Sequence, residues 1–147
     1  MIQNEFEQIY DKYTHMMLFA SSNKLRLENM RQEIVEAEKA YSEILEIENK
    51  DLTLNSMKGL NSRLEQILEE IESILYQYRD IDDMLHHIDV MIADYYELDI
   101  EIDLYELNGI EKDLLDVRNE NDNFNIIKSE INVLKQTIDD KINELKD

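Results

Sequence analysis

The sequence predicts an all-α protein whose long helices form an extended coiled coil or helical bundle, assembled with other chains as a hetero-oligomer. The main observation is a stripe of apolar residues whose spacing alternates between three and four. It consists of Met57, Leu60, Leu64, Ile67, Ile71, Ile74, Tyr78, Ile81, Leu85, Ile88, Ile92 and Tyr95. A mean spacing of about 3.5 residues keeps these side chains on one side of a helix, where they must be buried along another helix.

Two features of the composition favour the same fold class. The chain has 147 residues with no proline and only two glycines, so it lacks the usual residues of turns and loops. Hydrophobic residues make up 43% and charged residues 34%, which is typical of helices with one apolar stripe and a solvated remainder. At about 1.5 Å per residue, the stripe from 57 to 95 alone predicts a rod of roughly 60 Å.

The first expected helix covers about 2–45. Its apolar stripe passes through Asn23, the only polar residue at a buried position of that stripe. A buried asparagine can fix the register or the number of helices in a bundle. Alternatively, Ser21, Ser22 and Asn23 form a short break in the helix. The sequence leaves both interpretations open.

A break is expected at about 46–56, because continuing the first stripe would place Glu48 and Asp51 at buried positions. The apolar pattern resumes at Met57, out of step by one residue. If the chain turns here, the first two helices form an antiparallel hairpin. If it does not, one helix continues with a discontinuity in its packing.

The second expected helix covers about 57–107, with a change of phase near Asp99. Asn108-Gly109 then indicates a turn or a helix C-cap. A last helix is expected at about 110–147, with a kink in the polar segment 119–125. Together these elements predict a single elongated unit over 1–147.

The apolar face of the second helix is wider than a two-helix contact needs. Additional apolar residues flank the stripe on both sides, namely Leu68, Leu75 and Tyr96 on one side and Met84, Met91 and Leu98 on the other. A wide face of this kind packs against more than one neighbouring helix. A three- or four-stranded bundle is therefore expected.

The net charge of −20, from 35 acidic and 15 basic residues, restricts the partners. Such a chain repels nucleic-acid phosphates and anionic lipid headgroups. Two copies would also repel each other, which favours other helical subunits with basic flanking faces over a homodimer. The absence of cysteine is typical of an intracellular protein. The longest near-neutral run, 13–23, is too short to insert into a membrane, so a cytoplasmic protein is expected.

The stripe is also the predicted partner-binding surface. Its expected binding residues are Leu60, Leu64, Ile67, Ile71, Ile74, Tyr78, Ile81, Leu85, Ile88, Ile92 and Tyr95. No cofactor is expected, and no catalytic residue is assigned, because the chain has no glycine-rich phosphate loop and no pairing of a nucleophile with a base. An enzyme is therefore not expected.

Two groups of polar residues have the residue types of metal ligands. His86 and His87 lie among aspartates at helical spacing, but they fall outside the apolar stripe, so a solvated face is expected rather than a metal site. The acids of 99–103 are similar to the start of a calcium loop, but Leu104 stands where that loop requires glycine. No metal is therefore expected at either place.

A further pattern lies between 78 and 115. It combines a tyrosine, a leucine, an isoleucine–polar–valine motif, a second leucine and a final tyrosine-x-leucine motif. The corresponding residues are Tyr78, Leu85, Ile88-Asp89-Val90, Leu98 and Tyr105-Glu106-Leu107-Asn108. Asn108 occupies a position where an acid would be expected. This pattern resembles subunit 2 of the biogenesis of lysosome-related organelles complex. The resemblance implies a small helical subunit of an elongated hetero-oligomer that acts in endosome-lysosome trafficking, peripheral to those membranes through its partners.

The function expected from the sequence is that of a non-enzymatic coiled-coil adaptor or structural subunit of a multi-protein assembly. A kinetochore or cytoskeletal tether is an alternative, since it relies on the same helical packing. A different class is an acidic chaperone that binds basic proteins through its exposed faces.

Overall fold

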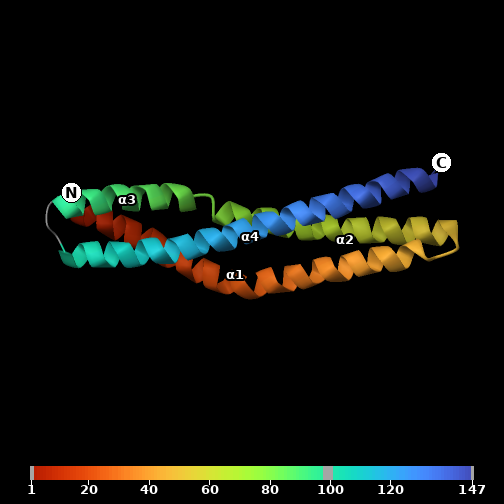
Figure 1. Cartoon of the computed structure of the whole chain (residues 1–147), viewed down its shortest axis with the longest axis horizontal. Helices are drawn as coiled ribbons and strands as arrows, with labels where there is room; N and C mark the ends of the chain where they lie inside the picture. The colour runs from red at the N-terminus through yellow and green to blue at the C-terminus, as the bar shows by residue number, and fades with distance from the viewer. Residues whose placement is uncertain (1, 98–100, 147) are drawn as a thin grey trace. The chain divides into compact units, whose positions relative to one another are not determined.

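The protein is all-α, as the sequence predicts. The computed structural model describes residues 2–97 and 101–146, which contain helices and the turns between them but no strand. The elements in chain order are α1 (Ile2–Leu45), α2 (Lys50–Gln77), α3 (Ile81–Glu97) and α4 (Glu101–Lys146) (Figure 1). The bounds of α1 are those expected from the sequence, and the helix is continuous through 21–23. The phase change expected near Asp99 lies outside the described residues.

The chain forms two compact units where the sequence predicted one over 1–147. The first unit consists of Met1–Lys24 and Tyr76–Asp122, and the second consists of Leu25–Leu75 and Asn123–Asp147. Both α1 and α4 contribute residues to each unit. Each unit therefore packs three helical segments of the same chain around one core.

In the second unit, α2 runs antiparallel to both of its neighbours. It turns back on α1 after the 46–49 connection (Figure 1). Two ion pairs join α2 to α4, with Lys135 Nζ 2.9 Å from Glu65 and Lys128 Nζ 3.7 Å from Glu72. The core of this unit contains Leu27, Met30, Ile34, Ala37, Met57, Leu60, Leu64, Ile67, Leu68, Ile71, Ile74, Phe124, Ile127, Ile131, Ile138 and Ile142.

The break between α1 and α2 is shorter than the expected 46–56. The helix α2 begins at Lys50 because Asn49 caps it: the Leu52 backbone N–H donates to Asn49 Oδ1 at 3.1 Å. Thr53 is buried, and its hydroxyl donates to the Asn49 carbonyl at 2.9 Å. A threonine satisfied in this way can occupy a core position, so the packed face of α2 begins before Met57.

In the first unit, α3 runs antiparallel to α4, as the contact of Asp82 with Arg118 and that of Asp89 with Glu111 show. The segment of α1 runs parallel to α4, since Phe6 lies near Glu106 and, two turns further along both helices, Tyr13 hydrogen-bonds to Asp113. The apolar core of this unit contains Ile9, Met16, Ala20, Tyr78, Ile81, Met84, Leu85, Ile88, Met91, Tyr95, Leu107, Ile110, Leu114 and Val117.

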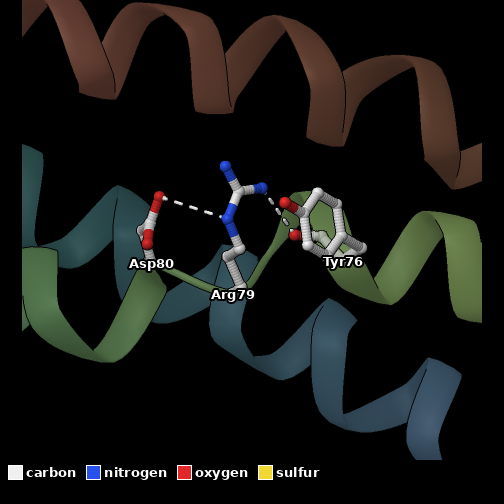
Figure 2. Close-up of polar contacts among 3 residues, drawn as sticks. All are labelled: Tyr76, Arg79 and Asp80. Carbon is white, nitrogen blue, oxygen red and sulfur yellow. Dashed lines mark hydrogen bonds and ion pairs between the residues drawn. The ribbon is translucent and has the colours of Figure 1, made fainter.

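A turn at 78–80 interrupts the helix that the sequence predicted over 57–107. The Ile81 N–H donates to the Tyr78 carbonyl at 3.0 Å, and the Met84 N–H donates to the Asp80 carbonyl at 2.9 Å, which starts α3. Figure 2 shows the Arg79 guanidinium over the Tyr76 ring, 4.1 Å from its centroid, with Asp80 on the other side. The sequence pattern misses this turn because Ile74, Tyr78 and Ile81 keep the spacing of the stripe across it.

The expected turn at Asn108-Gly109 is wrong. Both residues lie inside α4, which also continues as helix through 119–125. A glycine within a helix costs only about 1 kcal/mol. Burial of Leu107 and Ile110 on either side of these residues outweighs that cost, because each buried side chain of this kind contributes about 1.5–3 kcal/mol.

Candidate functional site

The residues predicted to bind a partner lie in the cores of the two units. Nearly all are buried, and Ile92 is half-buried. Leu60, Leu64, Ile67, Ile71 and Ile74 belong to the second unit, while Tyr78, Ile81, Leu85, Ile88, Ile92 and Tyr95 belong to the first. The chain supplies its own covering helices, which are held at a high effective concentration by the connections between them. A partner helix can reach these side chains only if a unit opens.

A buried polar cluster, formed by Asn23, Tyr78 and Glu120, lies at one end of the first unit. The Tyr78 hydroxyl donates to Glu120 Oε1 at 2.8 Å and accepts from Asn23 Nδ2 at 3.4 Å. The three side chains are 1%, 1% and 9% exposed, respectively. The Phe19 ring packs edge-on against Tyr78, with 4.6 Å between the ring centroids.

Burial determines the acid–base character of this cluster. Burial raises the pKa of Tyr78 well above its ordinary value. The hydrogen bond from Asn23 opposes this rise, and the hydrogen bond to Glu120 and the charge of Glu120 add to it. Burial also raises the pKa of Glu120, while Tyr78 and the charge of Lys24 lower it. The bonds join α1, the 78–80 turn and α4, so a shift of any one segment would leave a buried polar group without its partner. Such a cluster specifies the alignment of the three segments.

A groove opens on the surface of the first unit between α1 and α4, with a volume of about 510 Å³. We call it the α1–α4 groove. Its aromatic side is formed by Phe6, Tyr10 and Tyr13, whose successive ring centroids are 6.2 and 5.8 Å apart. The remaining lining residues are Glu7, Asp11, Glu106, Gly109, Ile110 and Asp113.

The helical repeat places these residues along the groove. Phe6, Tyr10 and Tyr13 follow a four–three spacing on α1, and Glu106, Ile110 and Asp113 follow the same spacing on α4, so each set lies on one face. The two rows meet where the Tyr13 hydroxyl donates to Asp113 Oδ2 at 2.6 Å. That hydrogen bond, together with burial and the charge of Asp113, raises the pKa of Tyr13 to about 12.

A second groove of the first unit, of about 550 Å³, has a different charge. Its lining combines Lys12, His15 and Arg79 with Asp11 and Asp80. It is therefore mixed in sign, whereas the charged residues described along the α1–α4 groove are acidic.

No family model, no curated protein and no solved structure matches the chain.

The structure places His86 and His87 on α3. His86 is exposed and His87 is half-buried on α3. Across residues 2–97 and 101–146, no three His, Cys, Asp or Glu side chains gather in a way that would hold a metal ion. Asp99, the first acid of the segment compared with a calcium loop, lies outside the described residues. Within the same described ranges, no helix is both long and apolar enough to cross a membrane.

Sequence reasoning missed the α1–α4 groove. Phe6 and Tyr13 share the spacing of the apolar stripe of the first helix, yet both are only half-buried, and Tyr10 is exposed. The available signal was the four–three spacing of three aromatic residues among Glu7 and Asp11. The contribution of α4 cannot be found in this way, because Tyr13 and Asp113 are 100 positions apart.

Proposed function

We propose that the protein is a non-enzymatic helical subunit of a multi-protein assembly, and that its acidic exterior binds other helical subunits with basic flanking faces. The observation that carries this proposal is the charge of the α3–α4 part of the first unit. From Asp80 to Glu111 the chain has no lysine or arginine. Exposed carboxylates within that run include Asp83, Asp89, Asp94, Glu97 and Glu106.

Exposed apolar side chains on the same unit add contact area to this charge. Tyr96 and Tyr105 are 75% and 82% exposed, and Val90 is 46% exposed. Tyrosine is enriched at protein interfaces because its ring is large and its hydroxyl can remain hydrated. A basic partner would neutralise the carboxylates while covering these rings. A second copy of this chain would add charge of the same sign, so a hetero-oligomer is favoured.

The resemblance of 78–115 to the lysosome-related organelle subunit supports a place in endosome-lysosome trafficking, on membranes reached through partners. A kinetochore or cytoskeletal tether is the alternative assembly. The acidic run also favours a second candidate function, that of an acidic chaperone for basic proteins. In that case the contacts would be mainly electrostatic and would dissociate at about 0.5 M salt, where charges are screened beyond a few ångströms.

The test is a pull-down from native lysate, identification of the partners and reconstitution with the purified partner. A variant with Asp83→Asn, Asp94→Asn and Glu97→Gln should recover much less partner. A matched variant of the second unit, with Glu36→Gln, Glu69→Gln and Glu70→Gln, has the same net charge and should behave like the wild type. Equal recovery by the two variants would overturn the proposal. If the complex survives at about 0.5 M salt, the result supports the function of an assembly subunit. If the complex dissociates, the result supports the function of an acidic chaperone.

A further inference from the structure

We infer that the α1–α4 groove of the first unit binds arginine side chains presented by a basic helical segment of the partner protein. This inference rests on the proposed function and assigns it a specific contact site. The groove combines aromatic faces, carboxylates and open volume, and each of these features limits the chemistry of what can bind there.

The charge of the lining selects a cation. Glu7, Asp11, Glu106 and Asp113 contribute carboxylates, and the lining residues that the structure describes include no lysine, arginine or histidine. The second groove of the unit lacks this selectivity, since Lys12 and Arg79 compensate its acids. The electrostatic attraction of a basic side chain is therefore stronger in the α1–α4 groove than in the second groove.

The aromatic rings favour a guanidinium over an ammonium group. Phe6, Tyr10 and Tyr13 form a row of rings with centroids about 6 Å apart. A planar guanidinium can stack on such rings while it donates hydrogen bonds from its edge, which an ammonium group cannot do. Cation and ring attract each other most strongly when the site is partly desolvated, as it is in a groove.

The protein already contains one example of this arrangement. The Arg79 guanidinium lies 4.1 Å from the centroid of the Tyr76 ring, and its Nε lies 3.9 Å from an Asp80 carboxylate oxygen (Figure 2). The α1–α4 groove has the tyrosine rings and the carboxylates of this arrangement. The arginine is the component that a partner would supply.

The carboxylate of Asp113 is held in place for this role. The Tyr13 hydroxyl donates to its Oδ2 at 2.6 Å, which fixes the group beside the rings. A carboxylate has about four acceptor positions, so this hydrogen bond leaves capacity for a guanidinium. An arginine that binds Asp113 would therefore also lie against Tyr10 or Tyr13.

The dimensions of the groove fit a helical ligand. A volume of about 510 Å³ lies within the usual range of ligand sites. Nothing lies within 4 Å of the position that a Cβ of Gly109 would occupy, so the side of α4 stays open at that residue. Phe6 and Tyr13 are two helical turns apart, about 10 Å, which equals the separation of two arginines seven residues apart on a partner helix.

The binding test uses the full chain and a fluorescent alanine-based helical peptide with two arginines seven residues apart, measured by fluorescence anisotropy at low salt. Asp113→Asn and Tyr10→Leu should each weaken binding about tenfold. Gly109→Leu should weaken it similarly by filling the groove without a change in charge. The matched controls are Asp51→Asn and Tyr41→Leu, which change the same residue types in the second unit and should retain wild-type affinity. Circular dichroism confirms that each variant is folded.

Three outcomes would overturn the inference. The first is equal affinity of the groove variants and their second-unit controls. The second is equal binding of a peptide in which neutral citrulline replaces both arginines. The third is displacement of the labelled peptide by spermidine as effectively as by the unlabelled arginine peptide at the same concentration of positive charge. That result would indicate a general cation effect.

The proposed function is tested separately from this inference. If the α3 amide variant loses the partner while the groove variants bind the arginine peptide normally, the function stands and the groove assignment fails. If the groove variants lose the peptide while the α3 amide variant and its second-unit control recover partner equally, the groove assignment stands and the α3 interface fails.

Discussion

The Tyr78 hydroxyl donates a hydrogen bond of 2.8 Å to Glu120 Oε1 in the interior of the first unit. This bond joins the 78–80 turn to α4 across 42 positions of sequence, and Asn23 extends it to α1. All three side chains are largely buried, so the loss of a hydrogen-bond partner would be costly. Their mutual bonding is therefore a condition for packing the three segments in this alignment.

Replacement of Tyr78 by phenylalanine should destabilise the protein by about 1–3 kcal/mol, because it removes the hydroxyl that both Asn23 and Glu120 contact. Urea denaturation followed by circular dichroism measures the change. The exposed Tyr96→Phe control should alter stability by less than about 0.5 kcal/mol. A cost as small as that of the control would show that the cluster contributes little to the alignment.

The buried carboxyl of Glu120 should make stability depend on pH. Its raised pKa means that the native state holds the proton more tightly than the unfolded chain does. The resulting stabilisation is present below the ordinary glutamate pKa and is lost as pH rises through the native pKa. Glu120→Gln cannot ionise, so its stability relative to the wild type should increase from pH 4 to pH 7. The exposed Glu69→Gln control should show no such trend in the same denaturation series.

A second pH effect should come from Asp89 on α3 and Glu111 on α4. The hydrogen bond between the two carboxyls, with burial and the charge of Asp89, raises the pKa of Glu111 to about 6. A raised carboxyl pKa stabilises the protonated native state, so the melting temperature should rise as pH falls from 7 to 5. Asp89→Asn should reduce that rise, whereas Asp94→Asn on the same helix should not. Identical pH profiles for the two variants would contradict this pairing.

The sequence predicts the helices well because their physical signals are local. The periodic apolar residues, the missing proline and the clash of Glu48 and Asp51 with the first stripe are all visible within a few turns of chain. The 78–80 turn is not visible, since Tyr78 and Ile81 preserve the spacing across it. Periodicity reports which face is buried, and it does not report whether the helix is continuous.

Periodicity also does not show which helix covers the apolar stripe, and this explains why the predicted partner-binding residues lie in the cores of the two units. A 3.5-residue pattern requires a covering helix, but it does not specify whether that helix comes from another chain or from this one. Here α1 and α4 provide the cover, so Ile71 and Ile88 are core residues. The α1–α4 groove depends on contacts such as Tyr13 with Asp113, which only the tertiary fold brings together.

Truncation of Ile71 to alanine should therefore cost about 2–5 kcal/mol, because the side chain is fully buried in the second unit. Val133→Ala is the matched control, since that side chain is 68% exposed and should change stability by less than about 0.5 kcal/mol. Chemical denaturation of the isolated protein measures both. If Ile71 instead served only to bind a partner, its truncation would leave the isolated protein as stable as the control.

The N-cap of α2 provides a separate test of the 46–49 connection. Asn49→Ala removes the acceptor of the Leu52 N–H and should cost about 1 kcal/mol. Asn49→Asp keeps a side-chain acceptor and should retain most of the stability. Asn55→Ala, an exposed change within the helix, controls for helix propensity. If α2 began later, as the sequence suggested, all three variants would have similar midpoints of unfolding.

Gly59 lies on an exposed position inside α2, where a glycine costs conformational entropy without a compensating contact. Nothing lies within 4 Å of the Cβ that an alanine would add. Gly59→Ala should therefore stabilise the protein by about 0.5–1 kcal/mol and raise its melting temperature by roughly 2–4 °C. Gly59→Val should gain less, because a β-branched side chain loses rotamer freedom in a helix. A lower melting temperature for the alanine variant would mean that another surface packs closely against α2 at this residue.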